Sequence, residues 1–167
     1  MTNLEIKVNC KDLKKIEGIL NSLNVKFLSE GFQRDTYFKV SRGNLKLRET
    51  NTGEDFLIWY KRRKKAEPKL SEYYIYQTEK SQNLKNFLKN AFGEKIIIEK
   101  IRKIYLYKNV RIHIDRVKGL GDFIELEAVL SKDDIDKESK ENMNFLVEKL
   151  CIRKEDLLKS SYSEIIK

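Results

Sequence analysis

Short segments in which charged and apolar residues alternate recur along the chain, and they constrain its fold more than any other feature. Residues 4–8 read Leu-Glu-Ile-Lys-Val, and residues 110–115 read Val-Arg-Ile-His-Ile-Asp. Successive side chains of a β-strand point to opposite faces, so each such segment predicts a strand with one charged and one apolar face. The predicted strands are 4–8, 34–40, 45–49, 56–61, 73–78, 96–107, 110–117 and 123–129.

The connections between these segments favour an antiparallel arrangement with a few helices. Turn-like gaps at 42–43, 51–53, 108–109 and 119–121 predict hairpins. Apolar residues at helical spacing predict amphipathic helices at 13–23 behind a cap at Asp12, at 84–92 before Gly93, and in a segment opened by Ser131 and Asp134. Weaker helical signals occur around 155–158 and at the C-terminus. At 167 residues this pattern predicts a single α+β domain, 1–167, built on an eight-stranded antiparallel sheet or barrel.

Several classes of protein are disfavoured by composition. No apolar run approaches the roughly 20 residues that span a bilayer, and the opening residues lack a signal-peptide pattern, so we expect a cytoplasmic protein without a membrane partner. Cys10 and Cys151 lie far apart in the sequence and predict two reduced thiols. With His113 as the single histidine, a metal would be held by carboxylates, which suit Mg²⁺ or Mn²⁺.

The net charge of +9 favours a polyanionic partner. The basic run 61–65 is either a nucleic-acid patch or a strand end that continues into a solvated loop. A nucleic-acid binder would leave the acidic strand that carries Glu125 and Glu127 without a purpose. Nucleic acid is therefore the less favoured partner.

The charged faces are segregated, basic on some strands and acidic on others. The simplest interpretation is a half-exposed sheet with a solvated outer face. The alternative is a wet tunnel, because each unpaired charge in a dry barrel interior would cost several kcal/mol. Bases beside carboxylates are what a metal–polyphosphate ligand requires: the bases neutralise phosphate oxygens and the carboxylates hold the bridging metal.

The order of these motifs resembles the CYTH superfamily, the triphosphate tunnel metalloenzymes, and especially its class IV adenylate cyclase branch. The resemblance covers nearly the whole chain. It rests on the ordered series Leu4-Glu5-Ile6-Lys7, Gln33-Arg34-Asp35-Thr36-Tyr37-Phe38, Leu45-Lys46-Leu47-Arg48-Glu49, Tyr60-Lys61-Arg62, Lys100-x-Arg102-x-x-Tyr105, Arg111-Ile112-His113-Ile114-Asp115, Gly119-Leu120-Gly121-Asp122-Phe123-Ile124-Glu125-Leu126-Glu127 and Ser160-Ser161-Tyr162-Ser163.

This resemblance implies an eight-stranded antiparallel β-tunnel, with amphipathic helices packed on its outside, that binds a triphosphate with Mg²⁺ or Mn²⁺. The implied metal ligands are Glu5, Glu125 and Glu127, with Asp115 a candidate near the metals. The implied triphosphate-binding residues are Lys7, Lys46, Arg48, Lys61, Lys100, Arg102 and Arg111. Lys7 and Asp115 are the candidates for catalysis, Asp115 as a general base. His113 has a weaker claim and is as well explained by a structural role.

One position departs from the family pattern. The opening motif of the family is Glu-x-Glu-x-Lys, and Asn3 occupies the place of the first Glu. An amide oxygen reaches a cation but brings no negative charge, so we expect one metal site to be weakened or altered in selectivity.

The resemblance implies conversion of ATP to cyclic AMP and pyrophosphate. A triphosphatase acting on inorganic tripolyphosphate, thiamine triphosphate or a nucleotide would use the same residues, and so would a module that binds a triphosphate without turnover. A homodimer is one expected oligomeric state.

Overall fold

The computed structural model describes residues 2–62, 69–130, 137–158 and 161–165. Its strands are β1 (Thr2–Asn9), β2 (Lys26–Phe38), β3 (Asn44–Thr50), β4 (Asp55–Arg62), β5 (Lys69–Thr78), β6 (Glu94–Tyr107), β7 (Val110–Val117) and β8 (Gly121–Leu130). The described helices are α1 (Leu13–Ser22), α2 (Ser81–Phe92), α3 (Lys137–Lys149), α4 (Tyr162–Ile165) and the 3₁₀ turn η1 (Lys154–Asp156).

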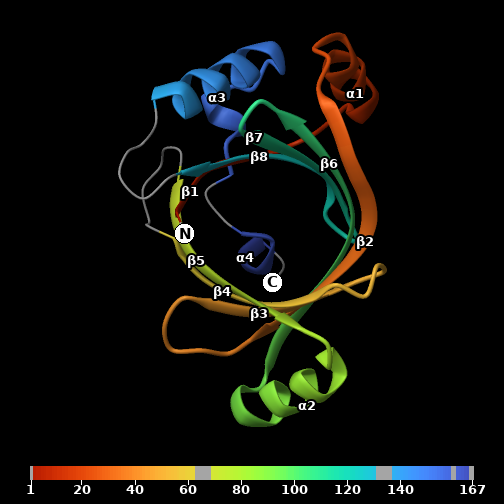
Figure 1. Cartoon of the computed structure of the whole chain (residues 1–167), viewed down its shortest axis with the longest axis vertical. Helices are drawn as coiled ribbons and strands as arrows, with labels where there is room; N and C mark the ends of the chain where they lie inside the picture. The colour runs from red at the N-terminus through yellow and green to blue at the C-terminus, as the bar shows by residue number, and fades with distance from the viewer. Residues whose placement is uncertain (1, 63–68, 131–136, 159–160, 166–167) are drawn as a thin grey trace.

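The eight strands form a closed antiparallel barrel in the order β1-β5-β4-β3-β2-β6-β7-β8 (Figure 1). Strand β1 closes it by pairing with β8 along its whole length and with the start of β5. The predicted eight-stranded antiparallel fold is confirmed, and every predicted strand is present. Strand β2 begins at Lys26, well before the predicted residue 34. Residues 26–30 are all exposed and show no alternation of burial, so the sequence carried no strand signal there.

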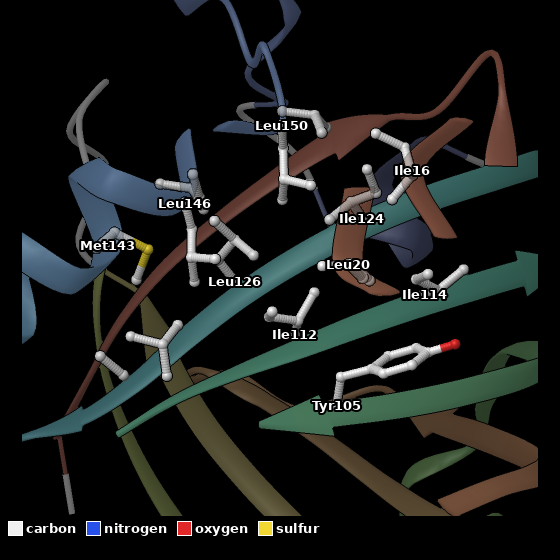
Figure 2. Packing of buried hydrophobic residues seen from close by; sticks show 14 of the residues in the cluster. Ile16, Leu20, Tyr105, Ile112, Ile114, Ile124, Leu126, Met143, Leu146 and Leu150 are labelled. Atoms are coloured by element: carbon white, nitrogen blue, oxygen red, sulfur yellow. The ribbon is translucent and has the colours of Figure 1, made fainter. Parts of the chain in front are cut away.

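The larger apolar core lies outside the barrel, between the outer faces of β1, β7 and β8 and the helices α1 and α3 (Figure 1). Figure 2 shows Ile112 and Leu126 of the barrel beside Leu146 of α3 and Leu20 of α1. Helix α1 begins as predicted, since the Asp12 carboxylate accepts a hydrogen bond from the Lys15 amide at 3.0 Å. These apolar faces point outward, so the charged faces of the same strands point into the barrel.

Helix α2 covers the outer face of β2 and β3. Leu88 packs against Phe38 and Leu47 in a second, smaller outer core. The helix ends as predicted at Gly93, whose φ of 75° is a conformation that glycine adopts readily. The predicted capping box at Ser131 and Asp134 lies outside the described residues, and the described part of α3 begins at Lys137.

Helix α4 departs from the expectation that the helices pack outside the barrel. In the view down the barrel it lies within the ring of strands (Figure 1), and Tyr162 packs against inward-facing apolar residues. We call this group the closed-end cluster: Tyr37, Tyr60, Ile98, Val117, Phe123 and Tyr162. It closes one end of the barrel, so the interior is a blind cavity. None of the described helices has the length and apolar character needed to cross a membrane.

Candidate active site

A cavity of about 580 Å³ occupies the barrel interior, and all eight strands contribute side chains to its lining. The residues come from alternate positions of each strand, for example Lys100 and Arg102 of β6 or Glu125 and Glu127 of β8. The charged faces therefore line a tunnel, and they are not a solvated outer surface.

Asp35 anchors the bases on one side of the cavity. Its carboxylate accepts a hydrogen bond from Lys46 Nζ at 2.8 Å and two from Arg48, at 2.7 and 2.9 Å. Burial opposes ionisation of Asp35, but the positive charges of Arg48 and Lys46 outweigh it and hold the pKa of Asp35 well below its usual value. The carboxylate thus stays charged and fixes both bases.

Asp115 anchors the bases on the other side. It accepts hydrogen bonds from Arg102 at 2.5 and 2.6 Å, from Lys100 Nζ at 3.1 Å and from the Tyr162 hydroxyl at 2.9 Å. Burial again opposes ionisation, and Arg102 and Lys100 nevertheless hold the pKa of Asp115 well below its usual value. Asp115 is fully buried and is surrounded by its own partners.

The remaining carboxylates lie on β8 and β1. Glu125 accepts a hydrogen bond from Arg102 at 2.8 Å and lies 3.5 Å from Lys7 Nζ. Glu127 lies 3.8 Å from Nε2 of His113, and it is directly opposite Glu5 in the β1–β8 register. Carboxylate oxygens of neighbouring strands thus share one side of the cavity.

His113 lies between these carboxylates, in surroundings that disfavour its charged form. Burial and the nearby Arg102 lower the pKa of the imidazole, despite the opposing effect of Glu125 and Glu127. Its buried Nδ1 has no hydrogen-bond partner among the described residues.

Exposure increases from the closed end of the cavity to its open mouth. The Lys100 side chain is 2% exposed and Arg102 is 7% exposed, whereas Glu127 is 17% and Arg111 is 51% exposed. The inward-facing residues that precede Lys100 and follow Asp115 on their strands, Ile98 and Val117, belong to the closed-end cluster. Bases therefore form the floor of the cavity, and Glu127 and Arg111 lie near its mouth.

The amines at the floor rest against tyrosine rings of the closed-end cluster. Lys7 Nζ lies 3.9 Å from the centroid of the Tyr162 ring, and Lys46 Nζ lies 5.5 Å from that of Tyr37. Burial and the neighbouring Arg48 lower the pKa of Lys46 to about 8 in spite of Asp35. An anion entering the cavity would therefore meet cations that are packed in place and poorly hydrated.

The donor chemistry of the cavity suits a hard divalent cation. Glu5, Glu125 and Glu127 offer carboxylate oxygens on one side of the cavity lining. Among the residues that the structure describes, no three carboxylate, imidazole or thiol groups already surround one point as metal ligands. Glu127, the more exposed of the β8 pair, and Glu5 beside it would hold a metal that enters from the mouth with an anionic ligand.

Comparison with known proteins agrees with this geometry. The family model described as the CYTH domain matches residues 1–162. The chain belongs to the CYTH family. A Methanocaldococcus jannaschii protein named "Putative adenylate cyclase" is 33% identical over 174 positions, spanning 99% of this chain and 98% of that protein.

Solved structures of CYTH-like fold superpose over almost the whole chain. A Pyrococcus horikoshii protein matches with a TM-score of 0.88 and 24% identity, over 99% of both chains. A Hippeastrum protein, described as a putative adenylyl cyclase with a dominant triphosphatase activity, matches with a TM-score of 0.65 and 11% identity, over 98% of this chain and 92% of that chain.

Most of the residues predicted for the site meet in this CYTH cavity. Its lining includes Glu5, Lys7, Lys46, Arg48, Lys100, Arg102, Arg111, His113, Glu125 and Glu127, with Asp115 buried directly behind Lys100 and Arg102. Lys61 is the exception, and the expectation that it lies inside is corrected. Lys61 is exposed, and the inward-facing neighbour is Tyr60, so alternation places Lys61 on the outer face.

Two functional positions were not singled out from the sequence. Asp35 was quoted only as part of a motif, although it shares the inner face of β2 with Tyr37 and so could have been found by alternation. Tyr162 was likewise quoted only as part of a motif, and its four-residue helix is too short for a period to show which way the side chain points. The side chain of Asn3 lies outside the described residues.

Proposed function

We propose that this CYTH protein is a metal-dependent adenylate cyclase that converts ATP to cyclic AMP and pyrophosphate. The observation that carries the proposal is the graded exposure of the cavity lining: Lys100 and Arg102 are held by the buried Asp115 at the floor, whereas Glu127 is 17% exposed and lies beside Arg111 near the mouth. The relative named "Putative adenylate cyclase" supports the same activity.

A blind cavity with a basic floor orients a triphosphate. The terminal phosphate enters first and reaches the floor, where Lys46, Lys100 and Lys7 neutralise its oxygens. The guanidinium groups of Arg48 and Arg102 hold the middle of the chain. The α-phosphate then lies toward the mouth, near Glu127, and the group attached to it lies at the mouth.

This orientation favours attack at the α-phosphorus. A divalent metal bound by Glu5, Glu125 and Glu127 would lower the pKa of the attacking 3′-hydroxyl. A bond forms between the 3′-oxygen and the α-phosphorus, and the bond from that phosphorus to the α,β-bridging oxygen breaks. The hydroxyl proton leaves through the mouth, and pyrophosphate departs with the electron pair while the floor cations stabilise its charge.

We propose that Asp115 is a positioning residue and does not act as a general base. A carboxylate with a lowered pKa and four hydrogen bonds from Arg102, Lys100 and Tyr162 is a weak proton acceptor. It positions the bases that contact the triphosphate. Lys7 acts directly, as a cation on the departing pyrophosphate.

A triphosphatase is the second candidate, since the same bases would hold the terminal phosphate for attack by water. The Hippeastrum protein, which has the same fold, is described as having a dominant triphosphatase activity. In the orientation proposed here the terminal phosphate would lie at the floor beside Lys100, which is 2% exposed, and so farthest from the solvent at the mouth; this supports the cyclase over the triphosphatase.

Product analysis tests the proposal. The protein is incubated with ATP, tripolyphosphate or thiamine triphosphate, each with Mg²⁺ and with Mn²⁺, and the products are separated by chromatography. Cyclic AMP with equimolar pyrophosphate is the expected result. Orthophosphate without a cyclic product would establish the triphosphatase, and binding without any product would establish a non-catalytic module.

The matched variant is Glu127→Gln, which keeps the shape of the side chain but removes the charge of a metal ligand. We expect a loss of at least about 100-fold in metal-dependent turnover with an unchanged melting temperature. Unaltered turnover in this variant would contradict the assignment of Glu127 to the metal.

A further inference from the structure

One wall of the cavity is largely apolar, with Glu54, just before β4, as the charged residue at its edge. The inward-facing residues of β4 and β5 that line it are apolar or aromatic: Phe56, Ile58, Tyr60, Tyr73 and Ile75. The strands on the opposite side of the barrel, β6 and β7, contribute charged or imidazole side chains to the lining: Lys100, Arg102, Arg111 and His113. The anionic oxygens of a triphosphate gain nothing from an apolar wall, so this wall is suited to a different part of the ligand.

The wall divides into a part that packs at the closed end and a part that stays accessible. Tyr60 belongs to the closed-end cluster, and Tyr73 and Ile58 pack against it. Phe56 and Ile75 lie one inward-facing position farther along their strands, on the side of the mouth. Ile75 is 55% exposed although it lines the cavity, and Phe56 is partly exposed.

These two side chains adjoin the bases of the cavity directly. Phe56 is opposite Arg48 in the β3–β4 register, and Ile58, which is opposite Lys46, is itself opposite Ile75. Side chains in directly opposed positions on one face of a sheet lie about 5 Å apart. The register puts Phe56 beside Arg48 and puts Ile75 in the row of Lys46, and the exposure of Ile75 places it on the side of the mouth. A ligand whose phosphates reach these bases therefore passes both side chains as it extends toward the mouth.

We propose that Phe56 and Ile75 form a subsite for the planar aromatic head of an organic triphosphate, a specificity-determining element that distinguishes a nucleotide from inorganic tripolyphosphate. The inference rests on the proposed function, because it assumes a triphosphate that enters with its terminal phosphate first. The ring of Phe56 stacks on the base, and Ile75 buries apolar surface against it. Such a subsite holds the ribose beside the carboxylates.

The test compares a triphosphate that carries an aromatic base with one that carries no organic group. Binding of α,β-methylene-ATP, which cannot be cyclised, and of tripolyphosphate is measured by calorimetry with Mg²⁺ for the full-length protein and for Phe56→Ala and Ile75→Ser. We expect each substitution to weaken the binding of α,β-methylene-ATP about tenfold, as loss of a base-stacking ring does, and to leave tripolyphosphate binding within twofold. Tyr76→Ala, an exposed aromatic on the opposite face of β5, is the matched control and changes neither affinity.

The outcomes separate this inference from the proposed function. Unchanged α,β-methylene-ATP affinity in both variants would overturn the subsite while leaving the triphosphate site intact. An equal loss for both ligands would also overturn it, since the wall would then support the bases and have no part in recognising a head. Failure of the unaltered protein to bind tripolyphosphate would instead defeat the proposed function.

Discussion

Asp35 and Asp115 allow four cations, three of them buried and Arg48 partly buried, to share one cavity. Each is almost fully buried, and each holds one lysine and one arginine through hydrogen bonds of 3.1 Å or less. Without these carboxylates the bases would repel one another in an environment of low dielectric constant. The cavity is therefore prepared for an anion before any anion binds.

Arg48 and Lys61 offer a matched comparison, because both were predicted from the sequence to bind the triphosphate and only Arg48 lines the cavity. We expect Arg48→Ala to weaken tripolyphosphate binding by about 10- to 100-fold, the loss of charge-assisted hydrogen bonds. Lys61→Ala should leave the affinity within twofold. Titration calorimetry measures both, and equal effects would mean that the inner and outer faces of the strands are wrongly assigned.

The lowered pKa of Lys46 leads to a prediction of how the free energy of unfolding depends on pH. Its folded-state pKa of about 8 is below the usual value of 10.5, so the unfolded chain binds more protons between these values. The free energy of unfolding should therefore rise as the pH increases from 8 toward 9.5, and Lys100, whose pKa is also lowered by burial and by Arg102, acts in the same direction. Urea unfolding at pH 7.5 and pH 9.5 measures this, and in Lys46→Met the rise should be smaller. An equally large rise in Lys46→Met and in the unaltered protein would contradict the assignment of this pH dependence to the buried Lys46 amine.

At the scale of the elements, α4 is what turns a tunnel into a blind cavity. It links the closed end to the bases through the Tyr162 hydroxyl, which donates to Asp115, and through the Tyr162 ring beneath Lys7. The ring also packs edge-on against Phe123 at 4.9 Å. The same residue therefore supports both the apolar closure and the charged floor.

These two roles are separable by substitution. Tyr162→Phe keeps the ring and should cost about 1 kcal/mol of unfolding free energy, a single hydrogen bond. Tyr162→Ala should cost about 3–5 kcal/mol through the cavity that it leaves, and should also weaken tripolyphosphate binding, because Lys7 loses its support. Urea denaturation and calorimetry measure both effects. Equal destabilisation by the two substitutions would show that the ring does not close the barrel.

At the scale of the whole molecule, much of the barrel and of its lining could be predicted from alternation alone. Ile112 and Leu126 had to face an apolar core, and the charged or imidazole residues on either side of each had to face the opposite way. Alternation does not say which face is inside a closed barrel, and that choice depended on the chemistry of bases beside carboxylates. The resemblance to the CYTH family supported the same choice.

The parts that were missed depend on contacts between residues distant in sequence. Lys61 was placed inside because it stands in a matching motif, whereas the pleat puts Tyr60 there. Asp115 was expected near the metals, and the structure pairs it with the bases because β6 and β7 place Arg102 directly opposite it. Helix α4 lies inside the barrel because Tyr162 completes an apolar cluster contributed by five strands. A cluster of residues so distant in sequence cannot be recognised from a local sequence pattern.

The orientation of the triphosphate is the central claim, and two ATP analogues test it directly. In β,γ-methylene-ATP the bond to the terminal phosphate cannot be hydrolysed, and in α,β-methylene-ATP the bond broken by cyclisation is blocked. With the α-phosphate toward the mouth, the protein should convert β,γ-methylene-ATP to cyclic AMP and methylenebisphosphonate and should leave α,β-methylene-ATP intact. Release of orthophosphate from α,β-methylene-ATP, with no product from β,γ-methylene-ATP, would contradict the account and place the attack on the terminal phosphorus.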